Sequence, residues 1–141
     1  MELSIRRPPD RVRSWWTDLP DDYFAKDPAE QPFRIVTVKL IPKGRGLLTY
    51  WGAPDGPVRE LRETIWVNED GTWTFEILNH PSGYKIFDEF SVTSKDGRAT
   101  TLLHIRSTLI PQNPLVPVNE LVERLIRVWR TAAEICERDT T

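Results

Sequence analysis

The sequence predicts an α+β fold: a curved, seven-stranded antiparallel sheet covered by a long C-terminal helix, with short helices after the first strand. Three observations predict it. Turn signals containing Gly or Pro punctuate the middle of the chain at regular spacing, and runs rich in Val, Ile, Thr and aromatic residues lie between them. The end of the chain has the apolar spacing of a helical face. The length of 141 residues fits one domain over residues 1–141.

The N-terminal part predicts a short strand at 2–6 and a short helix at about 11–18. Asp10 is suited to cap that helix, because its side-chain oxygen can accept a hydrogen bond from a free N–H group of the first turn. Residues 18–32 are acidic and polar, and they predict a loop or a broken helix. This segment lacks the glycine and the spacing of an EF-hand, so we interpret it as a solvated loop.

Six β-rich runs follow this loop. Short loops join consecutive runs, which predicts an antiparallel meander, because a parallel sheet would need crossover helices for which there is no room. The predicted strands lie at about 33–41, 46–52, 58–67, 72–79, 84–93 and 99–110.

Residues 115–137 predict one long amphipathic helix. Apolar residues recur there at spacings of three and four, and charged residues lie largely elsewhere. A single helix rarely fills the concave side of a curved sheet, so we expect a cavity between them. The side chains expected to face the sheet are Val118, Leu121, Val122, Leu125, Trp129 and Ala132.

Composition and charge argue against several classes of function. The net charge of −2 gives no sign of nucleic-acid binding, and no apolar stretch is long enough for a transmembrane helix. The single cysteine, Cys136, cannot form an internal disulfide, and the two histidines lie on different faces, which argues against a metal site. We therefore expect no metal, no cofactor and a cytoplasmic location. The charged N-terminus also differs from a signal peptide.

The order of the predicted elements and a loose N-terminal motif resemble a known superfamily. The motif runs from the opening strand through Pro8-Pro9-Asp10-Arg11-Val12 into a helix followed by Trp16-Thr17-Asp18. Over essentially the whole chain, the sequence resembles the START-related, or SRPBCC, superfamily with its helix-grip fold, and within it the polyketide cyclase/dehydrase-like and lipid-transfer-like branch. The resemblance implies a central cavity that binds hydrophobic ligands. It implies no catalytic motif, so catalytic residues stay unknown.

Turn chemistry predicts the register of the last two strands. Asp96-Gly97 suits a two-residue type I′ turn, which would pair Phe90 with Leu103 and Asp88 with Ile105. One face is then clearly apolar and should be buried. That face carries Tyr84, Ile86, Asp88, Phe90, Val92, Leu103, Ile105 and Leu109, and the outer face carries Glu89 opposite His104.

The turn from Asn68 to Gly71 predicts the register of the preceding pair of strands. It pairs Trp66 with Trp73, and we favour this aromatic face as the inward one. The opposite face argues for the reverse arrangement, because it is also apolar. The favoured face carries Arg62, Thr64, Trp66, Trp73, Phe75 and Ile77, and the opposite face carries Leu61, Glu63, Ile65, Val67, Thr74 and Glu76.

Asp88 and Arg62 are the polar residues of this predicted interior. An isolated buried carboxylate is costly, so Asp88 should be protonated or paired. It can orient a ligand or act as a general base, or it can be a structural group in an ion pair or hydrogen-bonded to Trp73, Tyr84 or a buried water. The candidate ligand-binding residues are Arg62, Trp66, Trp73, Phe75, Tyr84, Asp88, Phe90 and Trp129.

Three functions fit these residues. The first is binding, with or without transport, of a small hydrophobic or aromatic ligand between the sheet and the C-terminal helix. The second is an enzyme of polyketide cyclase/dehydratase or hydrolase type that acts in the same cavity. The third is a protein-interaction or chaperone co-activator module. We expect neither nucleic acid nor an integral membrane as partner, and the oligomeric state stays open, with a homodimer among the options.

Overall fold

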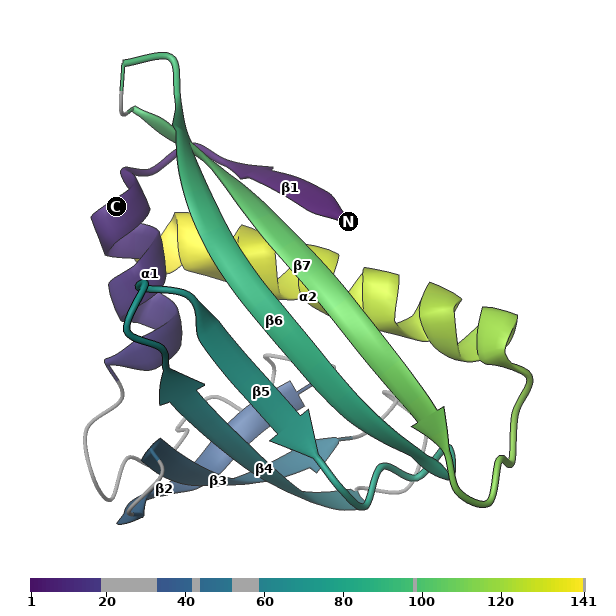
Figure 1. Ribbon diagram of the computed structural model, residues 1–141. Coiled ribbons are helices and arrows are strands. Elements are labelled where there is room, and N and C mark those ends of the chain that lie inside the picture. Colours follow the sequence, from purple (N-terminus) through teal and green to yellow (C-terminus); the bar gives the residue numbers. More distant parts are fainter. Residues whose placement is uncertain (19–32, 42–43, 52–58, 98, 141) are drawn as a thin grey trace.

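The computed structural model describes residues 1–18, 33–41, 44–51, 59–97 and 99–140, and for 33–41, 44–51 and 59–61 it describes the backbone (Figure 1). The predicted acidic loop lies, from residue 19 on, outside the described residues. The elements in chain order are β1 (Glu2–Ile5), α1 (Pro9–Thr17), β2 (Phe33–Ile41), β3 (Gly44–Trp51), β4 (Arg59–Val67), β5 (Trp73–Ile77), β6 (Tyr84–Lys95), β7 (Thr100–Pro111) and α2 (Val118–Asp139).

The strands pair antiparallel in the order β1-β7-β6-β5-β4-β3-β2. From β2 to β7 each strand lies beside the next one in the sequence, as in a meander. β1 lies beside β7, so strands from the two halves of the chain are neighbours. The predicted α+β class, with an antiparallel sheet and a C-terminal helix, is confirmed.

Both helices pack against one face of the sheet, which we call the inner face. Figure 1 shows α2 crossing behind β6 and β7, with α1 close to the C-terminal end of α2. Side chains of β6 alternate as the inner face requires: Ile86, Asp88 and Phe90 are buried, whereas Glu89 is exposed. The predicted orientation of β6 is therefore confirmed.

Helix α1 begins at Pro9 and not after Asp10. Pro8 is the N-cap, and no side chain caps the helix end by a hydrogen bond. Proline suits the first helical position, held here by Pro9, because its fixed φ angle fits the first turn and it has no N–H group to leave unpaired. The predicted capping role of Asp10 is thus wrong. Asp10 lies in the first turn, where its negative charge interacts favourably with the helix dipole.

The buried stripe of α2 differs from the prediction at two positions. Val118 is 52% exposed and Val122 is 40% exposed, so neither faces the sheet. Val122 follows Leu121 by about 100° around the helix axis and is turned away from the sheet. Val118 is the first residue of the helix. The buried side chains are Leu121, Leu125, Val128, Trp129, Ala132, Ala133 and Cys136.

The register of β6 and β7 is shifted by two residues from the predicted one. Asp88 lies opposite Ser107, Phe90 lies opposite Ile105, and the last pair before the turn is Lys95 with Thr100. The predicted pairs are therefore wrong. The predicted faces are still right, because side chains alternate with a period of two and a shift of two leaves each residue on its face.

The register of β4 and β5 is shifted by one residue, which reverses the faces of β4. Val67 lies opposite Trp73, and Gly71 has a φ of 83°. The Gly71 N–H donates to the Asn68 carbonyl at 3.0 Å, and the Asn68 N–H donates to the Thr72 carbonyl at 2.8 Å. This is a three-residue hairpin loop with a left-handed glycine, and the prediction assumed a two-residue loop.

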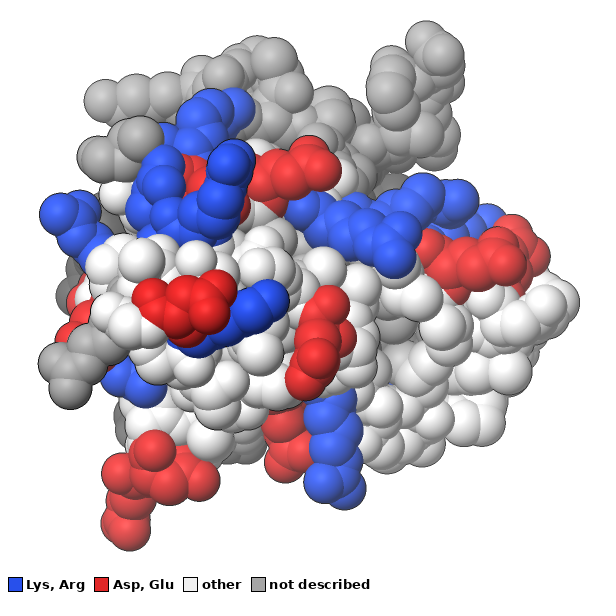
Figure 2. Space-filling view, turned by 90° about the horizontal axis from the view of Figure 1, so that it is seen from above, with Lys and Arg blue, Asp and Glu red and all other residues white. Residues whose placement is uncertain are grey.

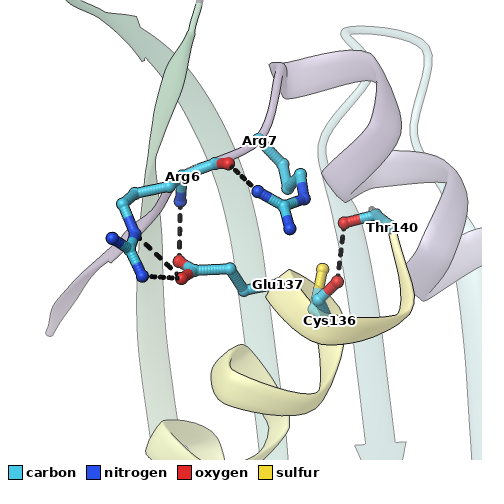
Figure 3. Close-up of polar contacts among 5 residues, drawn as sticks. All are labelled: Arg6, Arg7, Cys136, Glu137 and Thr140. Atoms are coloured by element: carbon cyan, nitrogen blue, oxygen red, sulfur yellow. Dashed lines mark hydrogen bonds and ion pairs between the residues drawn. The ribbon is translucent and has the colours of Figure 1, made fainter.

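A group of polar contacts, which we call the polar clamp, ties the end of α2 to the segment after β1 (Figure 3). The Arg6 backbone N–H donates to Glu137 Oε2 at 2.8 Å, and the Arg6 Nε and Nη2 groups donate to Oε1 at 2.9 and 2.8 Å. The Thr101 hydroxyl donates to the Arg7 carbonyl at 2.7 Å and holds the same segment to β7. The polar clamp thereby joins the end of α2 to the segment between β1 and α1.

Candidate functional site

Five aromatic side chains from four elements meet on the inner face, and we call them the aromatic cluster. The rings of Trp73 and Phe90 are stacked, with centroids 5.4 Å apart. The centroid of the Trp16 ring lies 5.3 Å from that of Phe90 and 5.6 Å from that of Trp129. All five side chains are buried. The aromatic cluster consists of Trp16 of α1, Trp73 and Phe75 of β5, Phe90 of β6 and Trp129 of α2.

Asp88 lies at the edge of the aromatic cluster and is fully buried. It stands directly opposite Phe75 on β5 and Ser107 on β7. The Ser107 hydroxyl donates to Asp88 Oδ1, whereas Asp88 Oδ2 has no partner among the described residues. Burial raises the pKa of Asp88 to about 6, and the hydrogen bond from Ser107 opposes part of that rise.

A second carboxyl group, Glu63, lies on the same face, and the sequence prediction missed it. Glu63 is opposite Ile77, and the next inward residue of β4, Ile65, is opposite Phe75. The side chain of Glu63 is half-buried. Burial raises its pKa to about 8, and the negative charge of Asp88 adds to the rise. The sequence did contain a signal for the inward position of Glu63, because apolar residues alternate on both sides of it. The favoured register had placed Glu63 and these apolar residues on the outer face.

The two carboxyl groups are in different protonation states at neutral pH. Asp88, with a pKa of about 6, is mostly ionised at pH 7, and Glu63, with a pKa of about 8, is mostly protonated. The inner face therefore offers one carboxylate that accepts hydrogen bonds and one carboxylic acid that can donate one.

Three tryptophans of the aromatic cluster carry buried N–H groups without a partner in the described part of the chain. They are the Nε1 groups of Trp16, Trp73 and Trp129. Roughly 90% or more of buried polar groups in proteins are hydrogen-bonded, so several unpaired groups in one cluster need an explanation. Tyr84, by contrast, is satisfied, because its hydroxyl donates to the Val116 carbonyl at 3.1 Å.

The structure brings most, but not all, of the predicted site residues together. Arg62 and Trp66 are placed on the outer face of the sheet, because the faces of β4 are reversed. Their predicted inward orientation is therefore wrong. The predicted residues on the inner face are Trp73, Phe75, Tyr84, Asp88, Phe90 and Trp129.

The outer face of the sheet carries an open groove of about 600 Å³. Trp66 and Phe87 line it together with polar side chains, and an ion pair joins Arg106 and Glu89 at 3.7 Å. Figure 2, which looks onto the molecule from above and so not onto the outer face, shows acidic and basic side chains interspersed with wide uncharged areas. The groove is lined by Trp66, Asn68, Asp70, Thr72, Thr74, Phe87, Glu89, Arg106 and Thr108.

The described contacts of His104 and Cys136 lie away from Asp88 and Glu63. His104 forms an ion pair with Glu2 at 3.0 Å and contacts Thr93, so its predicted pairing with Glu89 is wrong. The Cys136 thiol is buried, which raises its pKa to about 12. Among the described residues, no group of three His, Cys, Asp or Glu side chains is placed to hold a metal ion.

No protein-family model and no curated protein matches this sequence. Solved structures do match it in fold. An uncharacterised protein from Bacillus thuringiensis aligns with a TM-score of 0.65 and 18% identity, over 99% of this chain and 96% of its own. The protein XoxI from Bacillus cereus aligns with a TM-score of 0.62 and 20% identity, over 99% and 92%.

A third structure relates this fold to a named class of proteins. A START superfamily protein from Mycobacterium smegmatis aligns with a TM-score of 0.59 and 15% identity, over 95% of this chain and 94% of its own. The fold is therefore START-like, as the sequence resemblance implied. In the described part of the chain, no helix has the length and apolar character needed to span a bilayer.

Proposed function

We propose that this protein binds a small ligand with a hydrophobic or aromatic body, and so carries it. The ligand would lie between the inner face and α2. In this proposal residues 1–141 act as one helix-grip domain, in which seven antiparallel strands wrap around α2 and short helices follow β1. The protein works in the cytoplasm. The likeness to a START superfamily structure supports a ligand-binding domain.

One observation carries the proposal: a fully buried carboxylate oxygen, Asp88 Oδ2, has no partner in the described part of the chain. Such a group destabilises the fold, so a purely structural role does not account for it. Three unpaired indole N–H groups belong to rings that pack around the same region. A ligand with an apolar body and polar atoms would contact these rings and satisfy the unpaired groups.

Ser107, the hydrogen-bond partner of Asp88, reaches the surface of the molecule at the edge of the sheet. β1 pairs with β7 at residues 101–104, and Ser107 lies beyond that pairing. Ser107 is exposed, although it hydrogen-bonds to the fully buried Asp88. We propose that the ligand enters along this part of β7.

A fluorescence titration with the neutral probe N-phenyl-1-naphthylamine tests the proposal. We expect saturable binding that Trp73→Phe weakens, because Trp73 belongs to the aromatic cluster. The matched control is Trp66→Phe on the outer face, which should leave binding unchanged. Native mass spectrometry of protein purified from its own host should also show a bound small molecule.

The opposite pattern would contradict the proposal. If Trp66→Phe removes probe binding and Trp73→Phe does not, the ligand lies in the outer groove, and a protein-interaction role of that face becomes the better interpretation. If no probe binds and no small molecule co-purifies, the aromatic cluster is only a packed core.

A second candidate function is an enzyme that uses acid–base chemistry in the same place. The pKa values of Glu63 and Asp88 lie on either side of 7, so one group can donate a proton while the other accepts one. The test is chemical. A co-purified molecule that changes mass on incubation with the protein, but not with Asp88→Asn, would favour catalysis over carriage.

A further inference from the structure

Among the residues whose side chains are described, two carboxyl groups on the inner face have no cationic partner. In the part of the chain whose side chains are described, no lysine, arginine or histidine forms an ion pair with Asp88 or Glu63. Asp88 Oδ1 accepts the hydrogen bond from Ser107, and Asp88 Oδ2 is left over. Within these described residues, the site therefore carries an uncompensated negative charge when Asp88 is ionised.

We propose that the ligand carries a protonated amine, which donates a hydrogen bond to Asp88 Oδ2 while its apolar body packs against the aromatic cluster. This inference rests on the proposed function, because it names the class of ligand for the same site.

The negative charge of Asp88 favours an amine ligand over an alcohol or a carboxylic acid. An ammonium group offsets the cost of the buried carboxylate, and a charge-assisted hydrogen bond is roughly twice as strong as a neutral one. A neutral alcohol would supply the hydrogen bond without the compensating charge. A carboxylic acid ligand would add a second negative charge beside Asp88 and so would be repelled.

The aromatic cluster favours the same ligand class. The faces of tryptophan and phenylalanine rings attract cations, and this attraction is strongest for tryptophan and in sites removed from water. Trp16 and Trp129 lie close together, with ring centroids 5.6 Å apart, and both are buried. Carboxylate and ring faces together therefore suit a cation with an apolar body.

Glu63 adds little negative charge to the site at neutral pH. The Glu63 carboxyl stays mostly protonated at pH 7, so Asp88 supplies the single negative charge of the site. A monoamine then makes the occupied site electrically neutral. The protonated Glu63 carboxyl group can donate a hydrogen bond to an oxygen atom of the ligand.

Binding of the amine should depend on the ionisation of Asp88. Among the described residues, the other titratable groups of the inner side are Glu63 from β4, Tyr84 on β6 itself and Cys136. The charge of Asp88 raises the pKa of Glu63, whereas Cys136 lies near the end of α2 beside Arg7 and Asp139. With a pKa of about 6, the ionised share of Asp88 falls from about nine-tenths at pH 7 to about one-tenth at pH 5. Affinity for the amine should fall about tenfold over this range.

Three ligands with one body and different head groups test the inference: 2-naphthylmethylamine, 2-naphthylmethanol and 2-naphthoic acid, each used to displace bound N-phenyl-1-naphthylamine. We expect the amine to bind at least tenfold more tightly than the alcohol at pH 7, and the acid to bind most weakly. Asp88→Asn should remove the preference for the amine. The control Glu89→Gln, on the outer side of the same strand, should keep it.

A second variant separates charge from folding. Ser107 is exposed and its hydrogen bond lowers the pKa of Asp88, so Ser107→Ala should move the pH midpoint of amine binding upward while the alcohol binds as before. Equal displacement by all three ligands, stronger displacement by the acid, or no displacement by the amine would overturn the inference. Binding of the neutral probe would still support the proposed function, and its absence would remove both.

Discussion

Replacing Asp88 by asparagine should raise the free energy of unfolding of the ligand-free protein above pH 6. The ordinary pKa of an aspartate is 3.8, and burial raises the pKa of Asp88 to about 6. The folded protein therefore holds this proton at pH values where the unfolded chain has released it. Stability falls as pH rises between these two values, because the folded state binds more protons than the unfolded one.

The size of the effect follows from the two pKa values. Each pKa unit corresponds to about 1.4 kcal/mol, so ionisation of Asp88 destabilises the fold by about 3 kcal/mol at pH 7 and above. Near pH 4 the penalty is below about 1 kcal/mol, because the carboxyl is protonated when folded. Asparagine removes the charge, keeps the shape and can still accept the hydrogen bond from Ser107.

Urea unfolding of the wild type and of Asp88→Asn, followed by circular dichroism at pH 4, 6 and 8, measures this difference. The variant should gain roughly 2 kcal/mol relative to the wild type between pH 4 and pH 8. Glu89→Gln is the control, because Glu89 points outward and should give no such gain. If Asp88→Asn is the less stable protein at pH 8, the carboxylate has a partner in the fold, and the argument for an unsatisfied ligand site fails.

Leu125→Ala should lower the free energy of unfolding by about 2–5 kcal/mol, because Leu125 is on the buried side of α2. Val122→Ala should lower it much less, because Val122 is on the exposed side of the same helix. Chemical denaturation of both variants tests which side of α2 faces the sheet. Gly83→Ala should lower the melting temperature strongly, because the new Cβ would lie 1.8 Å from a backbone oxygen. The control Gly97→Ala has a similar φ angle and open space around it, so it should lower the free energy of unfolding by only about 1 kcal/mol. An equal loss of stability in both variants would contradict the close approach at Gly83. The Cys136 thiol should react with Ellman's reagent far more slowly in the native protein than in urea, since it is buried and its pKa is about 12.

The sequence was sufficient to predict the class of the fold, because turn signals and apolar periodicity are local properties. Strand positions agreed closely, and the inward orientation of Asp88 followed from the alternation along β6. The shift of two residues between β6 and β7 did not change which side chains face inward, because it leaves the faces intact.

The site could be predicted only in part, because its correct assembly depends on a single loop. One residue more in the loop before β5 moved Trp66 and Arg62 outward and brought Glu63 inward. Gly71 carried the signal, since a left-handed glycine at the third loop position is typical of three-residue hairpin loops. The burial of Trp16 rests on contacts with Phe90 and Trp129, which are distant in sequence.

The polar clamp has a consequence for the order in which this chain folds. The clamp joins residues 131 positions apart, and the Met1 amino group donates to the Ile105 carbonyl across 104 positions. The hairpins from β2 to β7 need only neighbouring sequence, whereas β1 and α2 can dock only after nearly the whole chain has been synthesised. Long-range contacts of this kind slow folding. We therefore expect the aromatic cluster to close in a late step, and the docking of α2 is the event to follow in refolding experiments.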